Sequence, residues 1–430
     1  MTQETRPQGR AQVNACLAAA DAKLARLRAL DPILIDVSLR EPCSSSYVGH
    51  TLRNKLDLLP LIDAFGFKDK VLATFNYQLS DHPQVEDDFC RHLNDSGYDL
   101  TGCFALTSVG TLQDAAFVPD ISMRKLVEYR IPNTIHELYL LPEAVPRADV
   151  LAALTASVRW LRAHLRGDHG GPCRIYLNIV DLADAFFACR DWACEVLEHL
   201  ARLQVEAVSF EDGRGSYFPF QIGAAVAAMK ALLRPDQKVL FHCHAGNGMD
   251  NASVLEALLQ GADGYWAGMD RESSTIGHAP LSELIANLMR AGNPNMAARY
   301  RVRELLSICR RMHHINTGQE IPPTWPIQGS NAYRQMLSSF EQVATRAMDL
   351  PPELIGEQYS FRISPVGSDV PVIQGRVQDA LGIAIDEAMA TRMILLMRSD
   401  LREGRRIRYD DPDQVRELYH RATAGLDDSA

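Results

Sequence analysis

The run KVLFHCHAGNG, residues 238–248, decides how this chain is interpreted. It is an apolar, β-type stretch that ends in His242 and His244 and enters a glycine-rich turn. Because residues two apart on a strand point to the same face, the two imidazoles lie side by side at the strand end. Two such rings can both reach one metal ion. The run therefore predicts a metal site at the end of a strand.

A second apolar run, ILIDVSLREP at residues 33–42, places Arg40 and Glu41 at the end of another strand. Asp36 lies on the same strand as a rival ligand, and we expect hydrogen bonds to satisfy it instead. A carboxylate with two or three imidazoles makes a mixed nitrogen and oxygen site. Such a site suits Mn, Fe, Co or Zn, and suits Mg less well.

Between and around these two runs, strand and helix patterns alternate. The expected strands are residues 33–39, 70–75, 102–108, 134–141, 174–180, 205–210, 238–244 and 261–268. The expected helices between them are residues 52–65, 83–95, 147–165, 187–203, 220–233, 249–260 and 279–292. This alternation predicts an α/β fold, a parallel (β/α)8 TIM barrel over residues 31–295. The alternative is an open doubly wound sheet, but no GxGxxG turn follows the first strand.

The segments that flank the predicted barrel are helical in pattern. Residues 1–30 hold an Ala- and Leu-rich helix over 11–30. Residues 296–430 form a mostly helical extension, a linker and subdomain. Its expected helices are residues 297–313, 331–349, 376–402 and 412–423, and segments that contain Pro and Gly join them.

Composition excludes several classes of protein. The 430 residues are 47% hydrophobic and 23% charged, with a formal net charge of −10. No long basic tract supports binding to nucleic acid, and no apolar run reaches the length of a membrane span. The N-terminus is polar and lacks the apolar core of a secretory signal. The nine cysteines are scattered, with no CxxC pair, which indicates reduced thiols and a cytoplasmic location.

Barrel enzymes place their chemistry at the C-terminal ends of the strands, and the candidate residues fall there. Arg40 and Glu41 end the first strand, His242 and His244 end the seventh, and His278 lies in the loop after the eighth. These strands are neighbours in a closed barrel, so the side chains are expected to converge. Taken singly, each has a structural alternative: an Arg–Glu ion pair, an incidental HxH pair and a solvated loop histidine.

Four motifs resemble those of the DRE-TIM metallolyase superfamily. They are DVSLRE at 36–41, SFEDGRGSYFPF at 209–220, HCHAGNG at 242–248 and GHAPLSELI at 277–285. Two later segments resemble the Claisen-condensing branch, which includes isopropylmalate and homocitrate synthases. These are HHINTGQEIPPTWPIQGSNAY at 313–333 and GRVQDALGIAI at 375–385.

The resemblance implies a role for each candidate residue. Glu41, His242 and His244 match metal-ligand positions, and His278 stands where the family usually supplies an asparagine ligand. Arg40 matches the arginine that stabilises the enolate oxygen. Further candidates for substrate binding are Ser44, Asp212 and Arg214.

The implied function is a divalent-metal-dependent acyltransferase. It would condense acetyl-CoA or another acyl-CoA with a 2-oxo acid to give a 2-hydroxy-2-carboxyalkyl acid. By analogy with the family's synthases, the chain is expected to form a homodimer. The alternatives are a metal-dependent carbon–carbon lyase or aldolase and, from another class, a degenerate barrel kept as a binding partner.

The chain also departs from the family pattern. Pro42-Cys43-Ser44 replaces the usual G-x-Q, and Gly213 replaces a threonine that binds the oxo-acid carboxylate. The synthases carry S-G-I-H after N-A-F, whereas residues 334–337 here read RQML and include no histidine. These departures predict a pocket rebuilt for an unusual substrate around a retained metal core.

Overall fold

The computed structural model describes residues 5–42, 48–114, 116–335, 350–409 and 411–427. The chain divides into two compact units, Met1–Glu320 and Ile321–Ala430, and each is described by itself.

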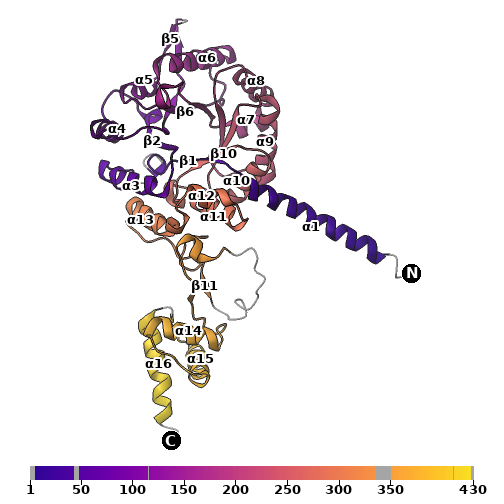
Figure 1. The fold of residues 1–430 in the computed structure, drawn as a ribbon, viewed down its shortest axis with the longest axis vertical. Helices are drawn as coiled ribbons and strands as arrows, with labels where there is room; N and C mark the ends of the chain where they lie inside the picture. The colour runs from indigo at the N-terminus through magenta and orange to yellow at the C-terminus, as the bar shows by residue number, and fades with distance from the viewer. Residues whose placement is uncertain (1–4, 43–47, 115, 336–349, 410, 428–430) are drawn as a thin grey trace. The chain divides into compact units, whose positions relative to one another are not determined.

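Eight parallel strands in the first unit form a closed barrel (Figure 1). In order around the barrel, they are β1 (Ile33–Asp36), β2 (Lys70–Thr74), β3 (Cys103–Ser108), β6 (Asn133–Leu138), β7 (Ile175–Ile179), β8 (Ala207–Asp212), β9 (Lys238–Cys243) and β10 (Gly264–Ala267). Strand β1 pairs with both β10 and β2, which closes the ring. This closure confirms the predicted (β/α)8 barrel and excludes the open doubly wound sheet.

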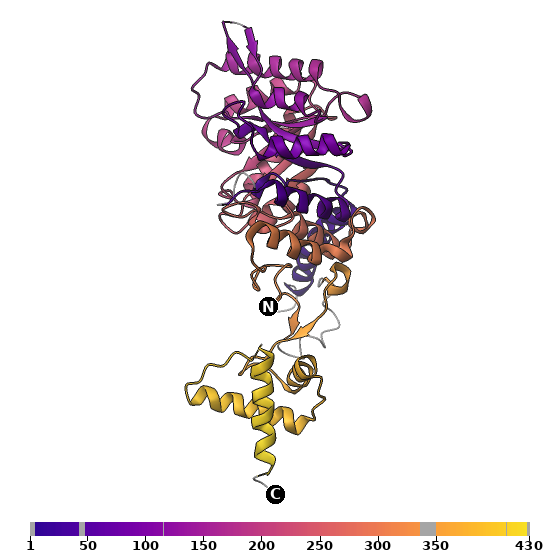
Figure 2. The same ribbon diagram turned by 90° about the vertical axis from the view of Figure 1, so that its left-hand side faces the viewer.

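Helices surround the barrel (Figures 1 and 2). They are α3 (Leu52–Phe65), α4 (Val85–Ser96), α5 (Ile121–Glu128), α6 (Arg147–His164), α7 (Leu182–Ala188), α8 (Arg190–Leu200), α9 (Pro219–Leu232), α10 (Asp250–Leu259) and α11 (Leu281–Arg290). The single helix expected over 187–203 is two, α7 and α8, with Cys189 in a non-helical conformation between them. An antiparallel hairpin, β4 (Thr111–Gln113) and β5 (Ala116–Val118), occupies part of the irregular stretch after β3.

The inside of the barrel is an apolar core topped by polar residues. The inward-facing core residues include Ile135 on β6, Tyr176 on β7, Ala207 on β8 and Leu240 on β9. Side chains on a strand alternate between faces, so residues at even spacing from these also point inward. The inward positions nearest the C-terminal ends of these four strands are therefore Glu137, Asn178, Glu211 and His242.

The first unit continues past the expected boundary after residue 295. Helices α12 (Pro294–Arg299) and α13 (Leu305–Thr317) belong to it, because α13 buries an apolar face that includes Leu306, Cys309 and Met312. Helix α1 (Thr5–Ala29) attaches to the unit through its C-terminal end, where Asn293 Nδ2 donates to the carbonyls of Leu27 and Leu30.

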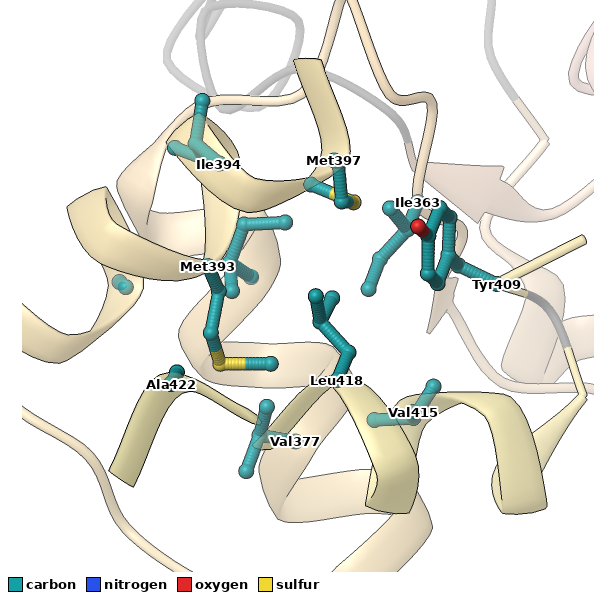
Figure 3. Close-up of a cluster of buried hydrophobic side chains, with 11 residues drawn as sticks. Ile363, Val377, Met393, Ile394, Met397, Tyr409, Val415, Leu418 and Ala422 are labelled. Carbon is teal, nitrogen blue, oxygen red and sulfur yellow. The ribbon is translucent and has the colours of Figure 1, made fainter. Parts of the chain in front are cut away.

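The second unit packs three helices around its own core. They are α14 (Val370–Leu381), α15 (Glu387–Arg402) and α16 (Pro412–Asp427). Figure 3 shows apolar side chains from all three, among them Val377, Met393 and Leu418, meeting at the centre. Two short strands, β11 (Arg334–Gln335) and β12 (Ser360–Phe361), pair in parallel.

Two helix predictions in this unit need comment. The helix expected over 376–402 is two helices, because Gly382 ends α14 at a φ of 70°. Residues 331–335 of the helix expected over 331–349 are turn and strand, and the rest lie outside the described residues. Across the described ranges of the chain, no helix has both the length and the apolar character of a membrane span.

Candidate metal centre and active site

Glu41, His242 and His244 meet at the C-terminal mouth of the barrel. One ligand atom from each lies within 4.8 Å of the others. The Nε2 atoms of His242 and His244 are 3.1 Å apart, and His244 Nε2 is 4.0 Å from a Glu41 carboxylate oxygen. Glu41 follows β1, while the histidines end β9, and β10 lies between these strands. The barrel thus brings together the three residues that the two sequence runs singled out.

Hydrogen bonds fix the orientation of both imidazoles. His242 Nδ1 lies 2.7 Å from the Trp266 carbonyl oxygen, which only accepts, so Nδ1 carries the proton and Nε2 presents a lone pair. His244 Nδ1 lies 2.9 Å from Ser274 Oγ. The ring of His242 also stacks on Trp266, with centroids 3.9 Å apart. Partners of this kind position histidine ligands in metal proteins.

The charge states of the three residues also suit a cation. Burial, followed by the neighbouring His244, lowers the pKa of His242 well below its usual value, and burial lowers the pKa of His244. Burial alone would raise the pKa of Glu41, but the Arg40 guanidinium outweighs it and lowers that pKa. The site therefore holds an ionised carboxylate and neutral imidazoles.

The residues present thus fit a divalent cation. Two imidazole nitrogens and one carboxylate converge, and such a mixed donor set suits Mn, Fe, Co or Zn better than Mg. Asp36 is not part of this group. Its carboxylate accepts from the backbone N–H and the hydroxyl of Ser38, at 3.0 and 2.9 Å, so it acts as a buried structural acceptor.

His278 lies beside the metal group and not within it. Its side chain is fully buried, so the solvated alternative is wrong. Its ring centroid is 5.9 Å from that of His242 and 6.4 Å from that of His244. Its Nε2 lies 3.0 Å from the Asp270 carbonyl oxygen, and Nδ1 has no hydrogen-bond partner among the described residues. A role for His278 as a fourth ligand stays a prediction.

Helix α13 supports the loop that carries His278. The Asp270 carboxylate accepts from His313 Nδ1 at 3.0 Å and from Asn316 Nδ2 at 3.4 Å. Asn316 also lies 3.0 Å from His50 Nε2. His50 and His313 thus belong to a buried network behind the site.

The three predicted substrate-binding residues have different surroundings. Asp212 accepts the backbone N–H groups of Ser216 and Tyr217, at 2.8 and 2.9 Å, so its carboxylate shapes the β8–α9 loop. Arg214 is exposed on that loop, and no ion pair is found for it within the described parts of the chain. Ser44 lies outside the described residues.

The Arg214 loop is in close contact with the loop that follows β9. A Cβ atom on Gly246 would lie 1.9 Å from the Arg214 carbonyl oxygen, so only glycine allows this approach. Gly246 therefore allows the β8–α9 loop to lie against the end of the metal-binding strand.

Sequence inspection missed an acidic group at the same mouth, on β6, β7 and β8, where Glu211 pairs in register with His242 on the neighbouring strand β9. Glu137, Asn178 and Glu211 end β6, β7 and β8, and all three are buried. Arg40 links the two sides, because its Nη1 donates to Glu41 and its Nη2 lies 3.8 Å from Glu137 Oε1. The available signal was a polar residue at an inward position of three apolar strands, as in IHELYL at 135–140.

Burial determines the protonation of this acidic group. It raises the pKa of Glu137 despite the nearby Arg40 guanidinium. Burial and then the charge of Glu137 raise the pKa of Glu211 to about 8. The pair therefore disfavours two simultaneous negative charges, and it binds a proton or a partner that donates hydrogen bonds.

Comparisons with known proteins find distant relatives and a shared fold. No family model matches the chain. A probable 2-isopropylmalate synthase from Methanosarcina mazei is 21% identical over 334 residues, 76% of this chain, and the chain spans about 60% of that relative's length. A 4-hydroxy-2-oxovalerate aldolase from Acidovorax sp. is 33% identical over 81 residues, which cover 19% of this chain and 24% of the aldolase.

Among solved structures, the hydroxymethylglutaryl-CoA lyase from Pseudomonas aeruginosa shares the fold. Its TM-score is 0.52 at 12% sequence identity, over 67% of this chain and 94% of the lyase. The closed barrel, the motifs at the ends of β1 and β9, and the distant synthase relatives support placing the chain in the DRE-TIM metallolyase superfamily.

Proposed function

We propose that this chain is a divalent-metal-dependent acyltransferase that condenses an acyl-CoA, in the first instance acetyl-CoA, with a 2-oxo acid. The observation that carries the proposal is the meeting of Glu41, His242 and His244 beside the Arg40 guanidinium. The 2-isopropylmalate synthase relative supports it, because that similarity extends over 76% of the chain.

The residues of the mouth have distinct roles in this reaction. Glu41, His242 and His244 would hold a divalent cation, which supplies Lewis-acid polarisation of the ketone of the 2-oxo acid. Arg40 presents its guanidinium to the oxygen of the thioester, where negative charge develops as the methyl proton leaves. Glu41 and Glu137 orient this guanidinium.

Burial strengthens these interactions. Arg40 is 5% exposed and Glu41 is 1% exposed, so little water competes for the guanidinium or the carboxylate. Charges interact more strongly where water is excluded. The donors are also fixed before the substrate arrives, so no rearrangement cost falls on the reacting state.

A carbon–carbon lyase or aldolase is the second candidate. The observation that favours it is the sequence RQML at 334–337, which lacks the histidine that the synthases carry there. The short match to the hydroxy-oxovalerate aldolase points the same way. The same Arg40 would stabilise the same kind of enolate when the bond is broken instead of formed.

A thiol-release assay separates the two candidates. The protein, loaded with Mn, Co or Zn, is mixed with acetyl-CoA and a panel of 2-oxo acids. Release of free thiol that depends on the oxo acid supports the condensation. Release of pyruvate or acetyl-CoA from hydroxy-acid substrates supports the lyase. If neither occurs, and the protein binds no metal, the degenerate barrel is the better account.

A further inference from the structure

The acidic side of the barrel mouth is a group of hydrogen-bond acceptors. Glu137, Asn178 and Glu211 end three consecutive strands and point inward above the apolar core. They lie on the side of the mouth that faces Arg40, and Arg40 in turn contacts the metal ligand Glu41. Their position places them beside any substrate that reaches the metal.

The donors that the protein supplies to this group are few. Asn178 Nδ2 donates to Glu211 Oε1 at 2.6 Å, and Asn76 Nδ2 donates to Glu137. Arg40 lies 3.8 Å from Glu137, beyond hydrogen-bond length, and also serves Glu41. Two buried carboxyl groups therefore share two amide donors and part of one guanidinium.

One acceptor in the group has no partner. Asn178 is fully buried, and among the described residues nothing donates to its Oδ1. The bond from its Nδ2 to Glu211 fixes which end of the amide is oxygen. Where Glu211 is ionised, a flipped amide would place that oxygen against the carboxylate. Because buried polar atoms are almost always hydrogen-bonded, this orphan oxygen indicates a donor that comes from a ligand.

Glu211 is not covered by a side chain at residue 213. Its Oε2 is 3.7 Å from where a Cβ atom on Gly213 would lie, so no side chain from that residue covers the oxygen. Gly213 stands where the resemblance to the superfamily expects a threonine that binds the carboxylate of the oxo acid. Residue 213, a glycine, therefore supplies no side-chain donor that could bind an anion.

We propose that Glu137, Asn178 and Glu211 bind a hydrogen-bond-donating group of the 2-oxo acid, a hydroxyl or a protonated amine, and exclude a second carboxylate. The proposal deepens the proposed condensation and rests on it, because it names the class of oxo acid. A second carboxylate would be buried against two acidic groups without a donor of its own, which is unfavourable. A hydroxyl or an ammonium would supply the donor that Asn178 Oδ1 lacks.

The test uses 2-oxobutanoate substituted at C4 with a methyl, a hydroxyl, an ammonium or a carboxylate group. These four oxo acids differ little in size. In the thiol-release assay, we expect kcat/KM for the hydroxyl or ammonium compound to exceed that for the methyl compound by about 10-fold or more. The carboxylate compound should be the poorest. The rank of hydroxyl against ammonium tells which donor the group prefers.

A binding measurement keeps the test independent of turnover. The metal-loaded protein is heated with each oxo acid in the absence of acyl-CoA, and the rise in Tm is compared. The hydroxyl or ammonium compound should raise Tm most. If no compound supports thiol release but this order of Tm holds, the proposed condensation is wrong, whereas the proposed binding of a hydrogen-bond donor by the acidic group is supported.

Two variants locate the effect. Glu211→Gln replaces a carboxyl acceptor with an amide and should reduce the kcat/KM ratio of the ammonium to the carboxylate compound by about 10-fold, with the difference between their Tm rises shrinking in the same direction. Glu198→Gln on α8, an exposed glutamate, is the matched control and should keep the wild-type order. Equal or better use of the carboxylate compound by the wild-type protein, in both readouts, overturns the proposal.

Discussion

The two sides of the barrel mouth differ in how their polar groups are satisfied. On the metal side, His242 and His244 each use one nitrogen for a protein partner and turn the other towards Glu41. On the acidic side, the described part of the chain supplies few donors to Glu137 and Glu211 and none to the Asn178 side-chain oxygen. The first side is organised to hold a cation, and the second is organised to accept hydrogen bonds from a ligand.

The comparison teaches which part of the site carries chemistry and which part selects. The metal side reproduces the motifs of the superfamily at the ends of β1 and β9. On the acidic side, Glu211 lies within the motif at 209–220, whereas Glu137 and Asn178 lie outside all four motifs. Metal-site residues that match the superfamily motifs, next to substrate-facing side chains that do not, are expected when a reaction is kept and its substrate changes.

The largest expected effect comes from breaking the metal side. His242→Ala removes one of the nitrogen ligands, so metal affinity should fall by at least about 10²-fold and turnover should be lost. Metal analysis after dialysis, together with the thiol-release assay, measures both. His92→Ala, on the exposed face of α4, is the control. A His242→Ala protein that still binds one equivalent of metal tightly would contradict the assignment.

Arg40→Ala tests the link between the two sides. The metal ligands remain, so metal content should stay near that of the wild type, while kcat falls on the order of 10²–10³-fold through loss of one oxyanion donor. Steady-state kinetics with the best oxo acid gives the value. Full activity would show that Arg40 is only a partner for Glu41.

The raised pKa of Glu211, on the acidic side, should make the stability of the protein depend on pH. The pKa of Glu211 is raised to about 8, above its value in the unfolded chain, by burial and then by Glu137. Folding then favours the protonated form, so stability is greatest below the unfolded pKa and is lost as the pH rises towards 8. The Glu211→Gln variant has no ionisable group at this position, so it should not show this loss of stability.

Unfolding of the metal-free protein by urea between pH 5 and pH 9 measures this effect. The wild-type protein should lose stability relative to Glu211→Gln as the pH rises, by up to a few kcal/mol. Parallel pH profiles for the two proteins would mean that Glu211 is not held protonated in the folded state.

The smallest effect is expected behind the site. His313 is buried and paired with Asp270, and this pairing outweighs burial and raises the pKa of His313. His313→Asn should cost about 1–3 kcal/mol in the free energy of unfolding and leave the metal stoichiometry at its wild-type value. His314→Asn, the exposed neighbour on α13, should have little effect. Equal stability of the two variants would contradict a stabilising role for the pairing of His313 with Asp270.

Much of the fold was predictable, because β-type stretches rich in apolar residues alternate with helical patterns along the first unit. All eight predicted strands occur, and the convergence of β1 and β9 follows from barrel closure. The end of the first unit was harder to place. Helix α13 packs on the barrel through Leu306 and Met312, and nothing local in the sequence distinguishes that contact from packing within an extension.

The site was predictable only where residues form a short motif. His242 and His244 are two apart on one strand, and Arg40 and Glu41 are adjacent, so each pair is visible in the sequence. Glu137, Asn178 and Glu211 come from three strands. Polar neighbours, His136 and Asp212, flank two of them, but no short motif joins the three. Their proximity depends on the strand register of the closed barrel, which cannot be predicted from a local sequence pattern.

The most direct test of the central claim is a titration of the metal-free protein with Zn or Mn, followed by calorimetry. One equivalent should bind per chain in the wild type. Glu41→Gln and His244→Ala should each weaken that binding by at least about 10²-fold, whereas Glu198→Gln should not. Unchanged affinity in both ligand variants would contradict the claim that these residues hold one cation at the mouth of the barrel.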